Sequence, residues 1–188
     1  TFSLNPCTAK GFGCTSPFNS INQRPIKMKR ILLIMCCFSF FTGYSQENKI
    51  TELLNNQLNT EIKEYYKSDS LKVTQPFHIN ESKKLVLEVE KYNPYMERWE
   101  VIKSEAPLDK IIGFVKDSNV ILLTDGYQVL TTTKTYDLNR KLIRTDVSDE
   151  NMFFTQIFEE KDNQKFRDKI MSAFKKAGYK ISSGHWFD

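Results

Sequence analysis

The sequence predicts an α+β domain in residues 46–188, in which one helix precedes and another follows an antiparallel meander of about six or seven strands. Two observations predict this arrangement. Apolar side chains recur with a helical period near residue 50 and again after residue 165. Between these segments they alternate with polar residues or form short runs flanked by turn residues. Helices segregated from the strands and packed on the sheet are typical of α+β folds.

The first helix is expected over residues 48–66. Apolar side chains recur there at every fourth residue and form one stripe, while Asn and Glu occupy the other faces. Because Asn is a weak helix former, we expect this helix to depend on docking against the rest of the domain. The stripe consists of Ile50, Leu54, Leu58, Ile62 and Tyr66.

The first strand is expected after residue 70, where Val73, Phe77 and Ile79 are interleaved with polar residues. Pro76 lies within this segment, and proline cannot donate a hydrogen bond to a neighbouring strand. We therefore expect an edge strand.

A hairpin is expected next, with strands over residues 84–92 and 97–104 around Asn93-Pro94-Tyr95. In the predicted register Lys91 lies opposite Glu97, which makes one face apolar and the other mostly charged. The apolar face then carries Leu85, Leu87, Val89, Trp99 and Val101, and the charged face carries Glu88, Glu90, Arg98 and Glu100.

A second hairpin is predicted by Asp125-Gly126, which lies between the apolar runs 120–124 and 127–131. Type I′ turns need positive φ at both central residues, so Asp-Gly between two such runs is a strong hairpin signal. Further short strands are expected over residues 111–115, 142–144 and 152–158.

The last helix is expected to begin at Asp162, which can cap it, and to end before Gly178, which favours the left-handed terminating conformation. Lys175 and Lys176 lie where the helix dipole favours cations. The apolar stripe consists of Phe166, Ile170, Ala173, Phe174 and Ala177. In layout alone, short strands followed by a C-terminal helix resemble the pleckstrin-homology-type barrel, and a cystatin-like curved sheet over a helix is the alternative.

A secretory signal is expected over residues 28–45. Lys29 and Arg30 precede the apolar run 31–41, and Gly43 and Ser45 supply small residues before a cleavage site between Ser45 and Gln46. The run is shorter than the roughly 20 residues that span a membrane, so we expect a secreted or periplasmic protein without a stable anchor. Residues 1–27 have no helical or strand period and are interpreted as a disordered upstream extension.

Charge and cysteine content exclude several classes of function for residues 46–188. Five of the 27 Lys and Arg residues precede residue 46, but none of the 23 Asp and Glu residues does, so this part carries a formal charge of −1. Its charges are not clustered, and a basic surface for nucleic acid is not expected. All Cys residues also precede residue 46, which excludes disulfides, thiol catalysis and Cys-ligated metals from the domain.

No catalytic or cofactor motif is found. His78 and His185 lack metal-ligand spacing, and Ser182-Ser183-Gly184-His185 does not match a nucleophile motif. We therefore expect no cofactor. The one enzymatic alternative is a small carboxylate-based hydrolase, because the predicted register brings Glu88 and Glu100 roughly opposite each other.

Exposed aromatic residues are common anchors for partners, and four are candidates for a ligand surface. They are Tyr92, Tyr95, Trp99 and Trp186. For Trp186 and Phe187 the competing interpretation is a last strand or lid that covers the core. We therefore expect a non-enzymatic binding module for an unknown protein, peptide or envelope ligand. An inhibitor or immunity-type protein is a further alternative.

Overall fold

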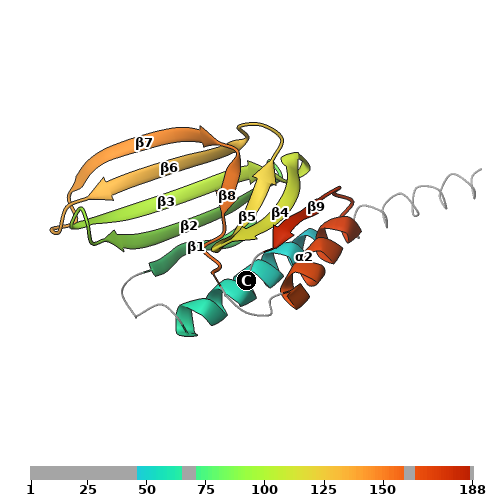
Figure 1. The fold of residues 1–188 in the computed structure, drawn as a ribbon. Helices are drawn as coiled ribbons and strands as arrows, with labels where there is room; N and C mark the ends of the chain where they lie inside the picture. Colours follow the sequence, from blue (N-terminus) through green and yellow to red (C-terminus); the bar gives the residue numbers. More distant parts are fainter. Residues whose placement is uncertain (1–45, 65–70, 159–163, 187–188) are drawn as a thin grey trace, which may run out of the picture. The chain divides into compact units, whose positions relative to one another are not determined.

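A computed structural model describes residues 46–64, 71–158 and 164–186. Residues 46–64 are helical, and the remaining elements follow in the order shown in Figure 1. The predicted signal segment 28–45, the extension 1–27, and Tyr66, Asp162 and Phe187 lie outside the described residues. The elements are β1 (Leu71–Ile79), β2 (Lys84–Asn93), β3 (Arg98–Pro107), the short 3₁₀ helix η1 (Leu108–Lys110), β4 (Ile111–Asp117), β5 (Asn119–Thr124), β6 (Val129–Tyr136), β7 (Leu142–Glu150), β8 (Met152–Phe154), α2 (Gln164–Lys176) and β9 (Ser182–Trp186).

The strands form two sheets. Sheet A is antiparallel with the order β1-β2-β3-β6-β7, and sheet B has the order β8-β5-β4-β9, with β9 parallel to β4. The predicted α+β class, with a helix on either side of an antiparallel meander, is confirmed. The sheets are not closed into a barrel, so the curved-sheet alternative fits this arrangement.

Strand β1 is an edge strand of sheet A, as Pro76 predicted. Its pairing with β2 is irregular before and across this proline, with register shifts between Val73 and Gln75 and between Gln75 and His78. A proline removes one hydrogen-bond donor, and the irregular pairing accommodates that loss at the sheet edge.

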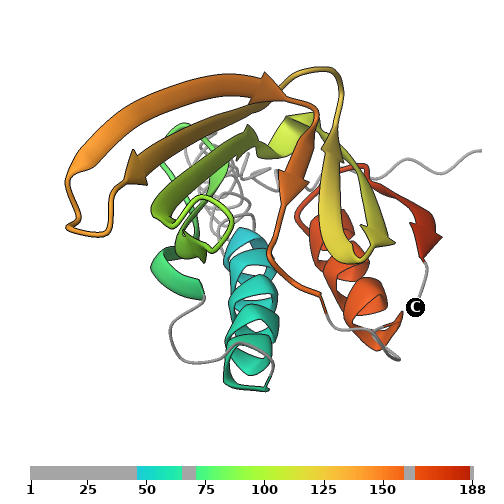
Figure 2. The ribbon, with the colours of Figure 1, turned by 60° about the vertical axis from the view of Figure 1, so that its left-hand side comes forward.

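The N-terminal helix docks against sheet A, which curves over it in Figure 2. Ile50, Leu54 and Leu58 are fully buried, as the four-residue period predicted. One polar side chain fixes the contact, because Asn55 donates to the Phe77 carbonyl and accepts from the Phe77 N–H, each at 2.8 Å. The Asn that weakens the isolated helix therefore attaches it to the edge strand.

Helix α2 packs into the same core. Phe166, Ile170, Ala173 and Phe174 are buried, and the Phe166 ring lies 6.1 Å from the ring of Phe114 on β4. At its C-terminus Gly178 has φ +90°, which confirms the predicted left-handed terminator. The Tyr179 N–H donates to the Phe174 carbonyl and the Gly178 N–H to that of Lys175, the bonding pattern of a Schellman motif.

The predicted register of the first hairpin is wrong by three residues. Lys91 lies opposite Glu100 instead of Glu97, and the ladder continues to the pair Asn93–Arg98. The turn is tighter than expected because the Asn93 carboxamide oxygen accepts from two turn N–H groups, and Glu97 adopts positive φ. An odd shift turns one strand over, so the partners of Leu85, Leu87 and Val89 on the helix side are Ala106, Ser104 and Ile102.

The second predicted hairpin is also wrong. Gly126 does adopt positive φ, as its turn chemistry requires. The strands that flank it do not pair, because β5 lies between β4 and β8 in sheet B whereas β6 lies between β3 and β7 in sheet A. Asp125-Gly126 therefore connects the two sheets. The hairpin of β5 is made with β4, around Ser118, which also has positive φ.

Within the described ranges, no helix is both long and apolar enough to cross a membrane.

Candidate functional site

Three of the four candidate aromatic residues lie at one end of sheet A. Tyr92 and Trp99 are directly opposite each other on β2 and β3, and their ring centroids are 5.2 Å apart. By strand alternation, this pair lies on the other face of β2 and β3 from Leu85, Leu87 and Val89. Trp99 is half-buried there, so it is part of a packed cluster instead of a freely exposed platform.

Arg140 completes this cluster from the β6–β7 loop. Its guanidinium carbon lies 3.9 Å from the centroid of the Trp99 ring, and the same guanidinium forms an ion pair with Glu90 on β2. The loop is ordered by Asp137, whose side chain accepts from the N–H groups of Asn139 and Lys141. No sequence pattern predicts the role of Arg140, because its partners lie 41 and 50 residues away and only the strand order brings them together.

The β2–β3 turn and the β6–β7 loop lie side by side at this end of the sheet, since β3 pairs with β6 and Trp99 lies opposite Tyr136 (Figure 1). Three large apolar side chains project from them: Tyr95 is 98% exposed, Met96 55% and Leu138 59%. We call Tyr95, Met96 and Leu138 the tip surface. Of the predicted candidates, Tyr95 has the exposure that a partner anchor requires.

A pocket of about 530 Å³ adjoins the cluster of Trp99, Glu90 and Arg140. Trp99, Glu90 and Arg140 form one part of its lining, and edge strand β1 and the N-terminal helix supply the rest. Two of its charged lining residues, Glu90 and Arg140, bind each other. The remaining lining residues are Asn59, Ile62, Leu71, Lys72 and Val73.

Trp186 does not belong to this site. It lies on β9 in sheet B, where its ring is 5.3 Å from that of Phe114 and the Arg167 guanidinium lies 5.7 Å from its centroid. The last strand covers the core at this point, which confirms the packing interpretation for Trp186.

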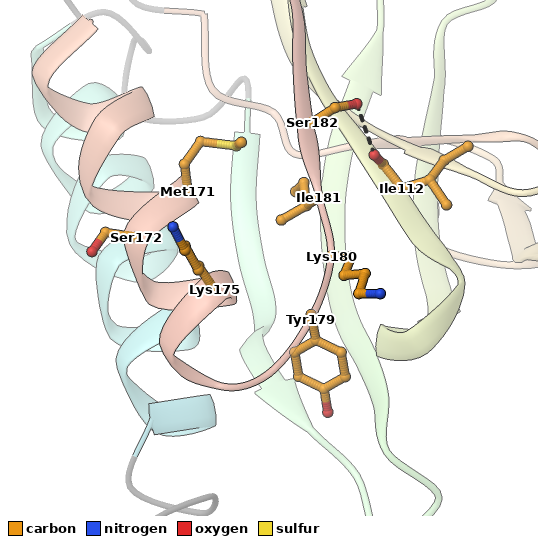
Figure 3. Close-up of a pocket in the computed structure, with 8 residues that line it drawn as sticks. All are labelled: Ile112, Met171, Ser172, Lys175, Tyr179, Lys180, Ile181 and Ser182. Atoms are coloured by element: carbon orange, nitrogen blue, oxygen red, sulfur yellow. Dashed lines mark hydrogen bonds between the residues drawn. The ribbon is translucent and has the colours of Figure 1, made fainter.

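A second pocket, of about 740 Å³, lies between α2 and the β4–β9 edge of sheet B (Figure 3). Ile112, Met171 and Ile181 form its apolar part, and Lys175 and Lys180 bring two cations to it. No ion pair of either lysine is recorded within the described residues. The other lining residues are Ser172, Tyr179 and Ser182.

The predicted carboxylate pair does not form. Glu88 lies opposite Lys103 and Glu100 opposite Lys91, so the two side chains are on opposite faces of sheet A. Glu88 accepts from the Thr74 hydroxyl, and Glu100 accepts from Asn93. Glu88 and Glu100 lie opposite each other only in the predicted register, with Lys91 opposite Glu97, which is wrong.

The two histidines are placed on different sheets, His78 on β1 and His185 on β9. His78 contacts the Pro76 carbonyl. Among the residues that the structure describes, no group of three His, Cys, Asp or Glu side chains is arranged to hold a metal ion.

A polar cluster centred on the buried Glu47 joins three distant segments. Glu47 on the N-terminal helix accepts from the Tyr179 hydroxyl at 2.7 Å and pairs with Lys83 of the β1–β2 turn at 2.5 Å. Partial burial raises the pKa of the Tyr179 phenol well above its ordinary value, and the hydrogen bond to Glu47 and the negative charge of Glu47 raise it further. This cluster fastens the helix to the end of α2.

Comparison of this chain with protein-family models, with curated proteins and with solved structures yields no match.

Proposed function

We propose that this chain is an exported, non-enzymatic binding module that holds a protein or peptide partner at the tip surface. The observation that carries the proposal is the almost complete exposure of Tyr95, on a turn that also exposes Met96. Tyrosine combines a large apolar ring with a hydroxyl group and is a frequent anchor in protein interfaces. Leu138, on the adjoining loop, extends the same apolar surface.

The base of the tip supports this role because it is held in place before a partner arrives. The Trp99 ring is packed between Tyr92 and Arg140, and Arg140 ties the β6–β7 loop to β2 through Glu90. Binding costs less conformational entropy when the contact loops are already ordered. The tip surface therefore offers exposed apolar groups on a fixed frame.

A photo-crosslinking experiment tests this proposal. A photoreactive phenylalanine analogue replaces Tyr95 in one variant and Tyr127 in a control, since Tyr127 is 70% exposed in the β5–β6 connection, at the other end of β6. We expect covalent adducts with one envelope or extracellular protein at position 95 and none at 127. Equal labelling at both positions, or none at either, would overturn the proposal.

The inhibitor or immunity-type alternative uses the same surface and differs only in the partner, which would be an enzyme outside the cytoplasm. An activity assay on the crosslinked partner separates the two roles. The hydrolase alternative loses the geometry that suggested it, because Glu88 and Glu100 lie on opposite faces of the sheet.

A second candidate function is favoured by the 740 Å³ pocket of Figure 3. Apolar walls beside Lys175 and Lys180 suit a small ligand with an apolar body and an anionic head, such as a fatty acid. A ligand at 100 times its Kd would add about 2.7 kcal/mol to the free energy of unfolding. We expect a rise in melting temperature with fatty acids that disappears in Lys175→Ala/Lys180→Ala. An unchanged melting temperature of the parent protein would exclude this function.

A further inference from the structure

Strand β7 is an edge of sheet A whose side chains are open to solvent on both faces. Every residue from Leu142 to Asp149 is exposed, including Val147 at 64%. Among the strands that the structure describes, it pairs only with β6. The outer edge of such a strand presents backbone N–H and C=O groups that can pair with another strand.

The charges along this strand are sorted by sign. Lys141 immediately precedes it and Arg144 lies in its first half, whereas Asp146 at its middle and Asp149 and Glu150 at its end are acidic. Charges often protect edge strands from unwanted pairing, but this protection does not require basic residues to be separated from acidic ones along the strand. A strand with a basic first half and an acidic second half is complementary to an antiparallel copy of itself.

Hydrogen-bond geometry restricts how two copies can pair. Only alternate residues point their N–H and C=O groups towards one edge. In two identical antiparallel strands, residues that point these groups towards the shared edge must lie opposite one another. The two numbers of each opposed pair are therefore both odd or both even, and one residue at the centre lies opposite its own copy. This leaves a few registers, each defined by its central residue.

The charges select among these registers. With Thr145 at the centre, Arg144 lies opposite the Asp146 of the second copy, and Lys141 lies opposite its Asp149. The same register brings Ile143 opposite Val147, which are 46% and 64% exposed in one copy. Each of these contacts occurs twice because the arrangement is two-fold symmetric.

The neighbouring registers are less favourable. A centre at residue 144 places two arginines opposite each other, and a centre at residue 146 does the same with two aspartates. With Val147 at the centre, Arg144 pairs with Glu150, but Asp146 lies opposite Ser148 and Asp149 opposite Thr145, so neither aspartate has an opposite charge.

We infer that a second copy of this chain binds at β7, antiparallel and centred on Thr145, so that sheet A continues across both copies. A two-fold axis perpendicular to the sheet keeps both N-terminal helices on the same side. Pairing is most regular from Arg144 to Asp146, because the extra residue between the pairs Thr135–Arg144 and Tyr136–Leu142 forms a bulge at Ile143. This interface is independent of the partner proposed for the tip surface.

Sedimentation analysis of the full chain over a range of concentrations tests this inference. We expect a monomer–dimer equilibrium for the parent protein and a dimer Kd at least about tenfold weaker for Arg144→Asp and for Asp146→Arg, because each places like charges opposite each other. Lys63→Glu, on the exposed side of the N-terminal helix, is the control and should dimerise as the parent does. A parent protein that stays monomeric overturns the inference.

Mixing the two variants provides the decisive measurement. An equimolar mixture of Arg144→Asp and Asp146→Arg chains restores opposite charges at both pairs of the proposed register, so heterodimers should form as readily as parent dimers. The Arg144–Asp146 ion pair within one chain, at 2.9 Å, cannot explain such a rescue, since neither variant contains it. Single variants that dimerise like the parent, or a mixture without heterodimers, contradict the register. Arg144→Asp/Asp146→Arg in one chain should dimerise with itself, which covers the case of a poorly folded single variant.

Discussion

The Arg140 guanidinium lies over the Trp99 indole, 3.9 Å from its centroid, although the two residues come from different hairpins. The same guanidinium is paired with Glu90, so one side chain connects the β6–β7 loop to β2 and β3 at the end of sheet A. Both the tip surface and the start of β7 depend on this contact, because Arg140 belongs to the loop that precedes β7.

Replacing this arginine should therefore loosen the tip without unfolding the domain. A cation–π contact at an exposed site contributes about 0.5–1 kcal/mol, and a half-exposed ion pair contributes a similar amount. We expect Arg140→Ala to lower the free energy of unfolding by about 1–2 kcal/mol. Arg140→Lys should lose about half as much, because it retains the charge but not the planar stacking. Urea unfolding measures both; equal stability of Arg140→Ala and the parent would refute the role of this contact.

The Tyr179–Glu47 hydrogen bond should make stability depend on pH in the alkaline range. The phenol has a raised pKa in the folded protein, so it stays neutral where the tyrosine of an unfolded chain ionises, near its ordinary value of 10.0. This stabilisation is fully present below that pH and is lost as pH rises above it.

Tyr179→Phe isolates this effect from the other tyrosines. At pH 7 the variant should be less stable by about 1–2 kcal/mol, because Glu47 loses one donor but keeps Lys83. The difference from the parent should shrink above pH 10, as measured by urea unfolding at several pH values. A difference that stays constant up to pH 11 would mean that the phenol does not titrate as described.

A larger residue at position 184 should be destabilising, because a Cβ atom there would lie 2.5 Å from the Val115 Cγ1 atom. Val115 is buried on β4, and its branched side chain has little freedom to move away. We expect Gly184→Ala to cost about 1–3 kcal/mol and Ser183→Ala, at an exposed neighbour, less than about 0.5 kcal/mol. In Gly184→Ala/Val115→Ala the two costs should be strongly non-additive; simple additivity would show that β9 does not pack on β4 in this way.

Export should remove the predicted signal segment, residues 28–45, in a bacterial or other secretory host. We expect the secreted protein to begin at Gln46, because Gly43 and Ser45 are the small residues that the signal peptidase recognises. Ser45→Leu should leave the precursor uncleaved. Intact-mass measurement of the exported and retained fractions checks both outcomes, and an exported protein that keeps residues 28–45 would disprove the cleavage site.

Local patterns predicted the helices and the edge strand correctly. The period of Ile50, Leu54 and Leu58 determines which face is buried, and Gly178 ends α2 through its own backbone conformation. Pro76 predicted an edge strand because it lacks an N–H group in every environment. Each of these features depends on residues within one helix or strand, so it can be predicted from the local sequence.

The pairing of strands required information from outside each segment. Gly126 has the backbone conformation that its sequence predicts, yet β5 and β6 separate because each finds better partners in a different sheet. The β2–β3 register was missed because two hydrogen bonds to Asn93 shorten the turn. The carboxylate pair followed from that register and failed with it.

The sequence by itself determined the α+β class, the helical stripes, the positive φ of Gly126 and Gly178, and the candidate status of Tyr92, Tyr95 and Trp99, since each follows from patterns of residues close in the chain. Only the tertiary structure decided that Trp186 is packed on Phe114, that Arg140 joins Trp99, and that β7 remains an open edge. The physical reason is that hydrogen bonds between strands are similar in strength for many partners. The choice among partners therefore depends on which side chains the whole fold can bury together.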